Sequence, residues 1–223
     1  MNGRWVNLID LAPFIMGVLI VILGAGPAVS KVSDSCVIAG QKAAARFAVP
    51  PAVLLAITQT ETGRNDGGNI RPWPWTLNIN GKGYWLDGRA DALAMARAQI
   101  AAGRTSIDLG CFQINFRWHG QNFNSLDEML DPDVSAAYAA QFLRKLYSET
   151  GNWSAAAGAY HSRSPAQAAN YRKRFDRFYA VAAQNSQILA STRQRMNMFP
   201  LLQAGGGQTA MGSLVPMPEG AKR

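Results

Sequence analysis

Apolar side chains recur every three or four residues along most of the chain, and this period predicts a mainly α-helical fold. Several predicted helices have proline in the first turn or glycine just after the last, as helices commonly do. In the helix opened by Pro132, the core-facing positions are expected to be Val134, Ala137, Tyr138, Phe142 and Leu146. We expect helices over residues 35–47, 50–62, 87–102 (capped by Asp87), 132–150 and 154–160, with Gly63, Gly103 and Gly151 as stop residues. A short helix is expected to begin at Ser125, and a final one opens at Pro165 with an apolar period that fades after about residue 190.

A region of different pattern, residues 64–106, is inserted after the second helix. Two short segments of strand-forming residues, 76–79 and 84–86, flank Asn80-Gly81-Lys82-Gly83, which predicts a β-hairpin with a glycine-rich turn. The expected fold class is therefore mainly α, or α+β, with a small β-hairpin insertion. Four aromatic residues near the hairpin either form a small hydrophobic core or offer ring faces to a ligand: Trp73, Trp75, Tyr84 and Trp85.

The two ends of the chain differ in composition from the middle. Residues 11–26 are nearly all apolar, and Ala28-Val29-Ser30 supplies the small residues that a signal peptidase recognises. Because this apolar run is short for a membrane span, we expect a signal peptide over residues 1–30, with an uncleaved membrane anchor as the alternative. At the other end, glycine-rich sequence without apolar periodicity predicts a flexible tail over residues 191–223. One domain, residues 31–190, is expected between them.

Composition and charge limit the class of partner. The chain is 48% hydrophobic and only 16% charged, which is typical of a globular protein. A formal net charge of +8 predicts an anionic partner. The basic residues are scattered and form no nucleic-acid-binding motif. We therefore expect an acidic polysaccharide or an anionic envelope surface as the partner, and no nucleic acid.

The two cysteines, Cys36 and Cys111, both follow the predicted signal peptide. In an oxidising compartment such a pair indicates a disulfide, which would close a loop of about 75 residues. If the chain is not exported, two buried free thiols are the better interpretation.

The chemistry-bearing residues favour a single carboxylic acid. Glu61 ends the apolar stripe of the second helix, where partial burial would raise its pKa and let it donate a proton near neutral pH. By itself this pattern also fits a surface glutamate on a last helical turn. The only two histidines, His119 and His161, match no metal-binding spacing, and neither a nucleophile motif nor a phosphate-binding loop is present. No metal and no cofactor are expected.

Three stretches in order resemble the motifs of the family 1 lytic transglycosylases, whose SLT-type domain has a lysozyme-like fold. Glu61-Thr62-Gly63 resembles their Glu-Ser motif, and residues 110–115, Gly-Cys-Phe-Gln-Ile-Asn, resemble their Gly-Leu-Met-Gln motif. Ala159-Tyr160-His161 resembles their Ala-Tyr-Asn motif. The resemblance covers about residues 35–183. It departs from the family at Thr62, at Cys111-Phe112, at His161 and in the length of the aromatic insertion.

The resemblance implies a peptidoglycan lytic transglycosylase that cleaves the MurNAc–GlcNAc β-1,4 bond and leaves 1,6-anhydro-MurNAc ends. One glutamate, Glu61, would act first as acid and then as base. The implied residues around the substrate are Thr62, Gln113, Asn115, Tyr160, His161 and, through their rings, Trp75 and Tyr84. Asp66 and Asp108 are the nearest candidates for a second carboxylate, and we expect structural roles for both. A lysozyme-type hydrolase and an inactive glycan-binding scaffold remain the alternatives.

Such an enzyme would meet the glycan strands of peptidoglycan in the periplasm. Family members of this size often open the wall locally, so a flagellar, pilus or secretion-system component is an expected partner for the C-terminal tail. Membrane contact is expected only if the N-terminal segment stays uncleaved.

Overall fold

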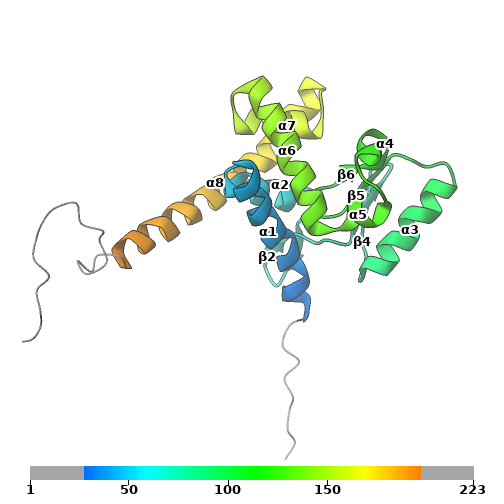
Figure 1. Cartoon of the computed structure of the whole chain (residues 1–223), viewed down its shortest axis with the longest axis horizontal. Coiled ribbons are helices and arrows are strands. Elements are labelled where there is room, and N and C mark those ends of the chain that lie inside the picture. The colour runs from blue at the N-terminus through cyan, green and yellow to red at the C-terminus, as the bar shows by residue number, and fades with distance from the viewer. Residues whose placement is uncertain (1–27, 197–223) are drawn as a thin grey trace, which may run out of the picture.

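The structure of the protein is a computed structural model that describes residues 28–196 (Figure 1). The predicted signal peptide, residues 1–30, lies outside this range apart from its last three residues, and so does most of the predicted tail. No helix within the described range is long and apolar enough to cross a membrane. The helices are α1 (Ala28–Phe47), α2 (Pro51–Thr62), α3 (Arg89–Ala101), α4 (Phe116–His119), the 3-10 turn η1 (Gly120–Asn122), α5 (Leu126–Leu130), α6 (Pro132–Thr150), α7 (Trp153–His161) and α8 (Pro165–Met196).

Six short strands form two antiparallel sheets. The smaller sheet is a hairpin of β1 (Arg64–Asp66) and β2 (Asn69–Arg71). The larger one has the order β4-β3-β5-β6 and contains the predicted hairpin as β3 and β4. Figure 1 shows this sheet, with α3 beside it, on one side of the molecule and the α6–α8 helices on the other. The bounds of its strands are β3 (Thr76–Ile79), β4 (Lys82–Trp85), β5 (Ile107–Leu109) and β6 (Ile114–Asn115).

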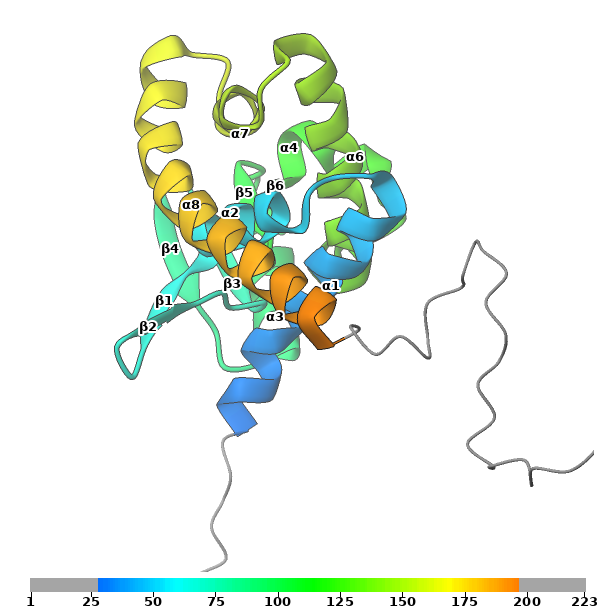
Figure 2. The same cartoon turned by 90° about the vertical axis from the view of Figure 1, so that its left-hand side faces the viewer.

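Helix α2 lies at the centre of the helical part, in contact with α1, α6 and α8 (Figure 2). Three of its apolar residues, Val53, Leu54 and Ile57, are completely buried, as the sequence predicts. Helix α2 ends before Gly63, as predicted, but this glycine is not needed for a left-handed backbone conformation. Gly63 has an ordinary negative φ, and a Cβ atom there would lie within 2.3 Å of the Gln59 carbonyl oxygen and 2.6 Å of Ile70. Close packing therefore requires glycine at this position.

The mainly α, lysozyme-like fold with a β-hairpin is as predicted, and most helix bounds agree within a few residues. Two helices are longer than the sequence indicates: α1 begins at Ala28 rather than at Ser35, and α8 continues to Met196, so the predicted tail of residues 191–223 begins too early. Asp87 was expected to cap α3, but Gly88 occupies the N-cap position and no side chain caps this helix.

The buried face of α6 differs from the predicted one. Val134 is 39% exposed, because α6 turns a row of small residues toward α1 and α7 instead. Small side chains let two helix backbones approach closely, and an apolar period alone does not show this choice of face. Tyr138 and Phe142 lie on the edge of that face and are only partly buried. The residues buried along α6 are Ser135, Ala136, Ala139, Ala140, Leu143 and Leu146.

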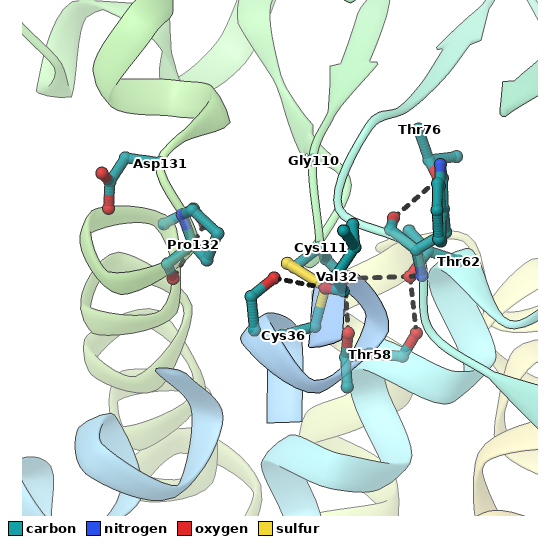
Figure 3. The surroundings of a disulfide bond; sticks show 12 residues. Val32, Cys36, Thr58, Thr62, Thr76, Gly110, Cys111, Asp131 and Pro132 are labelled. Atoms are coloured by element: carbon teal, nitrogen blue, oxygen red, sulfur yellow. Dashed lines mark hydrogen bonds between the residues drawn. A yellow bond between two sulfur atoms is a disulfide. The ribbon is translucent and has the colours of Figure 1, made fainter. Parts of the chain in front are cut away.

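The disulfide between Cys36 of α1 and Cys111 is present, with a sequence separation of 75 residues (Figure 3). Both cysteines are buried, so the bond ties α1 to the loop between β5 and β6 inside the core. No described cysteine is free.

Replacing both cysteines by alanine should lower the free energy of unfolding by about 4 kcal/mol, because the unfolded chain regains the freedom of a long closed loop. Urea denaturation of the oxidised wild type and of the Cys36→Ala/Cys111→Ala variant measures this difference. Reductant should destabilise the wild type and leave the double variant unchanged. Two titratable thiols in the denatured wild type, produced in an oxidising compartment, would contradict the pairing.

Candidate active site

A cleft of about 290 Å³ lies where the larger sheet faces the helices α2, α6 and α7. Both the sheet and the helices supply its wall, so residues far apart in the sequence meet there. The lining residues are Glu61, Asn78, Asp108, Gln113, Ile114, Asn115, Trp118, His119, Phe142, Tyr160 and His161.

Glu61 reaches this cleft from the last turn of α2, with its carboxyl group partly buried. The hydroxyl of Tyr171, on α8, donates a hydrogen bond of 2.7 Å to Glu61 Oε1. Desolvation by burial is the main cause that raises the pKa of Glu61 to about 7, and the negative charge of Asp108 raises it further. The Tyr171 hydrogen bond and the positive charge of Arg174 act in the opposite direction. Near neutral pH, the carboxyl can therefore both give and take a proton.

Two threonines of α2 hold its end against the loop that follows β5 (Figure 3). Thr58 donates a hydrogen bond of 2.8 Å to the Cys111 carbonyl oxygen. The hydroxyl of Thr62 donates to the Thr58 carbonyl and accepts from the backbone N–H of Trp73, so it also holds the start of the insertion. Thr62 is completely buried, so this residue supports the position of Glu61 and does not line the cleft.

The loop of residues 110–113 turns tightly and presents Gln113 to the cleft. Gly110 and Gln113 both have positive φ, 71° and 47°. The Gln113 side-chain amide donates to the carbonyl oxygens of Thr76 and Gly110, at 3.1 and 3.0 Å. With both amide protons used by the backbone, Oε1 is left as the group that can accept a hydrogen bond from a bound molecule.

Three polar side chains form a row across the sheet on its cleft side. Asn78 of β3 pairs with Asp108 of β5, and Asp108 pairs with Asn115 of β6. Asn115 donates a hydrogen bond of 2.6 Å to Asp108 Oδ1. Burial is the main cause that raises the pKa of Asp108 above its ordinary value. The Oδ1 atom of Asn78 is buried and has no hydrogen-bond partner within residues 28–196.

Aromatic rings form the helical side of the cleft. Tyr160, on α7, donates a hydrogen bond of 2.7 Å to the Phe112 carbonyl oxygen. His161 stacks on the ring of Tyr171, with 4.6 Å between ring centroids. Burial lowers the pKa of His161, so this imidazole is neutral near pH 7. His119 Nδ1 lies 2.7 Å from the Tyr138 hydroxyl.

The structure brings together five of the predicted site residues, namely Glu61, Gln113, Asn115, Tyr160 and His161. The other three, Thr62, Trp75 and Tyr84, lie outside the cleft lining. The rings of Trp75 and Tyr84 are partly buried against the hydrophobic core, which favours the alternative of a small core around the hairpin. Asp66 also lies away from the cleft, 3.5 Å from Arg71.

Sequence reasoning missed two features of the site. Tyr171 has the helical spacing of a core residue and is buried, but its hydroxyl contacts Glu61 from 110 residues away. Asp108, for which the sequence predicts a structural role, also lines the cleft. The pairing register of β3 and β5, which also brings in Asn78, could not be read from the chain. Within residues 28–196, no three His, Cys, Asp or Glu side chains gather as they would around a metal ion.

We predict that Glu61→Gln stabilises the protein at alkaline pH. Because the pKa of Glu61 is about 7 in the folded state and near 4.5 unfolded, the folded protein retains a proton that the unfolded chain loses. Wild-type stability should therefore fall as pH rises through this window, by up to about 3 kcal/mol. The neutral glutamine avoids this loss. Urea denaturation should give similar stabilities at pH 4 and a more stable variant at pH 8.

Glu149→Gln is the matched control for this measurement. The hydrogen bond from Arg163 lowers the pKa of Glu149, so its contribution to stability is present at neutral pH and is lost on acidification. Its substitution should therefore destabilise the protein at neutral pH, opposite in sign to Glu61→Gln. Equal pH dependence of the wild type and the Glu61→Gln variant would contradict the burial of the Glu61 carboxyl.

Comparison with known proteins identifies part of this chain. Residues 90–185 match the family model described as the transglycosylase SLT domain. The matched range includes Gln113, Asn115, Tyr160, His161 and Tyr171, while Glu61 precedes it. No curated protein matches the chain, and no solved structure matches it. The family consists of lytic transglycosylases acting on peptidoglycan. The match agrees with the motifs and with the lysozyme-like fold, and residues 90–185 are thus similar to the SLT-type transglycosylase domain.

Proposed function

We propose that this protein is a peptidoglycan lytic transglycosylase that cleaves the MurNAc–GlcNAc β-1,4 bond and leaves 1,6-anhydro-MurNAc ends. The observation that carries the proposal is the placement of Glu61. Its carboxyl group lies in the cleft with a pKa of about 7 and a hydrogen bond from Tyr171. An acid with this pKa is suited to protonate a leaving oxygen and then to accept a proton.

The proposed reaction uses Glu61 twice. Since the Tyr171 hydroxyl donates to Oε1, the transferable proton belongs on Oε2. Glu61 gives this proton to the glycosidic oxygen as the C1–O bond of MurNAc breaks, and the acetamido oxygen of the same sugar closes on C1. The carboxylate then takes the proton of the C6 hydroxyl, whose oxygen attacks C1 and releases the acetamido group. No water is consumed, and the Tyr171 hydrogen bond stabilises the carboxylate between the two steps.

Neutral hydrogen-bonding groups around Glu61 support this assignment. Gln113 has a free acceptor at Oε1, which suits an N–H or a hydroxyl of the sugar. Tyr160 and His161 bound the opposite side of the cleft. We assign these three residues to substrate positioning, together with Asn115.

A hydrolase is the second candidate, and Asp108 is the observation that favours it. Asp108 lines the same cleft, and its charge acts on Glu61. A second carboxylate in this place can activate a water molecule, and hydrolysis then gives a reducing sugar. We prefer the lyase because Asn115 already engages Asp108 and burial disfavours its charged form.

Glu61→Gln should fold, bind glycan strands and lose cleavage. Glutamine retains the acceptor for Tyr171 but cannot transfer a proton. General acid–base catalysis by one group typically contributes ~10²–10⁴-fold, and both steps depend on this residue, so we expect the upper end. Mass spectrometry of products from purified sacculi measures the loss and identifies the wild-type ends.

Asp108→Asn, the matched control in the same cleft, should retain substantial turnover and the anhydro product. Reducing ends from the wild type, or an inactive but folded Asp108→Asn, would favour the hydrolase. A wild type that binds strands without cleaving them would favour the scaffold.

We also propose that the protein is exported to the periplasm and opens the wall locally for an envelope-spanning machine. The apolar N-terminal sequence and the cysteine pair support export. A flagellar, pilus or secretion-system component is the proposed partner of the C-terminal sequence, which lies outside the described residues.

Truncation after Met196 tests this division of roles. All cleft residues precede this position, so the shortened protein should keep wild-type turnover on isolated sacculi. Its function in the cell should be lost if the removed sequence docks the enzyme. Turnover and complementation by the same variant measure the two roles separately. Loss of turnover by the folded truncated protein would assign residues 197–223 to the active domain.

A further inference from the structure

Arg174 carries a positive charge next to Tyr171, although it is not itself a lining residue of the cleft. It lies on α8 one turn after Tyr171, and its guanidinium carbon is 5.5 Å from the centroid of the Tyr171 ring. The side chain is exposed and forms no ion pair with any residue in the range 28–196. Its cation is therefore available to a bound molecule.

The ring of Tyr171 links this cation to the proposed catalytic acid. Tyr171 carries the hydroxyl that contacts Glu61, and His161, a lining residue of the cleft, stacks on the same ring. Burial is the main cause that lowers the pKa of His161, and the charge of Arg174 lowers it further; the same charge opposes the rise in the pKa of Glu61 that burial causes. Because burial also lowers the pKa of His161, that side chain is a neutral hydrogen-bonding group beside a permanent cation.

Within residues 28–196, the sheet side of the cleft contains an acid and no lysine or arginine. The sheet contributes two asparagines and the carboxyl of Asp108. On α8, residues 172–177 contain four basic side chains and a single acid, Asp176. An anionic group on a bound glycan would consequently be attracted toward Arg174 rather than toward the sheet side of the cleft.

The substrate proposed above carries such a group close to the bond that breaks. In MurNAc the lactyl ether is attached to C3 of the ring whose C1–O bond is cleaved. This ether ends either in a free carboxylate, when the stem peptide has been removed, or in a peptide that has carboxylates of its own. Any glycan with its scissile oxygen at Glu61 therefore brings a carboxylate-bearing branch near the side chains around that residue.

We propose that Arg174, with His161 beside it, forms a subsite for a carboxylate carried on the lactyl branch of MurNAc. The inference rests on the proposed function, and it adds to it the part of the substrate that is recognised. Arg174 supplies the charge and a forked donor, which matches carboxylate geometry. His161 supplies a neutral hydrogen-bonding atom at the place where the family motif has asparagine, so the departure in this chain accompanies the cationic neighbour.

The test measures binding to the Glu61→Gln protein, with and without Arg174→Gln, so that no substrate is consumed. Three ligands separate the possible sources of the carboxylate: peptide-bearing glycan strands, strands stripped by an amidase, which retain free lactyl carboxylates, and neutral chito-oligosaccharides. Lys173→Gln is the matched control, because it removes the same charge from an exposed neighbour on the same helix.

We expect Arg174→Gln to weaken binding of at least one anionic ligand by roughly five- to tenfold, the range of a charge-assisted hydrogen bond at an exposed site. Binding of chito-oligosaccharides should be unchanged, and Lys173→Gln should leave all three ligands unaffected. Selective loss with peptide-bearing strands would assign a stem-peptide carboxylate, and selective loss with stripped strands would assign the lactyl carboxylate. Arg174→Lys should recover most of the affinity.

Two outcomes would overturn the subsite. In the first, Arg174→Gln binds all three ligands like its parent. In the second, it weakens the neutral oligosaccharide as much as the anionic strands, which would indicate a general effect on the cleft. Neither depends on catalysis, so a wild type without anhydro products would reject the proposed function while the binding comparison still decides the role of Arg174. When Glu61 is intact, Arg174→Gln should also shift the alkaline limb of the pH–activity profile to higher pH. The shift should be the same for every substrate, because it follows from losing a cation that lowers the pKa of Glu61.

Discussion

The tight loop at residues 110–113 is the constraint on which the candidate site depends. Three successive carbonyl oxygens of this loop accept hydrogen bonds from three separate side chains: Gly110 from Gln113, Cys111 from Thr58 and Phe112 from Tyr160. The disulfide to α1 fixes the same loop covalently. A single short segment thus sets the distance between α2, which carries Glu61, and α7, which carries Tyr160. Buried carbonyls without these partners would each cost free energy, so the loop and the helices hold one another in place.

The properties of Glu61 follow from this packing. A carboxyl at the end of an exposed helix would titrate well below neutral pH. Here α2 is central, its end lies against the loop, and burial raises the pKa of the carboxyl to about 7. The hydrogen bond from Tyr171 and the charge of Arg174 lower this pKa, so the value near 7 is the net result of opposing effects. A fully apolar pocket would retain the proton too strongly for the carboxylate to act as a base in the same cycle.

The sequence predicts those parts of the site that depend on local pattern. The apolar stripe of α2 leads to Glu61, as expected. The contacts that the sequence does not reveal are those between distant segments. Tyr171 has the spacing of a core residue, and nothing local shows that its hydroxyl meets a carboxyl on another helix. The same holds for the row from Asn78 to Asn115, because it requires the register of three strands. Thr62 illustrates the opposite case: its motif points to the substrate, whereas tertiary packing uses its hydroxyl inside the core.

The two walls of the cleft differ in a way that bears on how one glutamate can suffice. On the sheet side, Asp108 has its Oδ1 engaged by Asn115 and a pKa raised by burial, so its charged form is disfavoured. On the helical side, Tyr171 is buried and donates a hydrogen bond to Glu61, and Arg174 lies 5.5 Å from the centroid of the Tyr171 ring. The charge that develops on Glu61 during the proposed reaction is thus balanced by a hydrogen bond and a distant cation rather than by a contact ion pair. A direct ion pair would lower the pKa of the acid and weaken it as a proton donor. The hydrogen bond from Tyr171 stabilises the carboxylate of Glu61, and without a contact ion pair the pKa stays high enough for Glu61 to donate a proton.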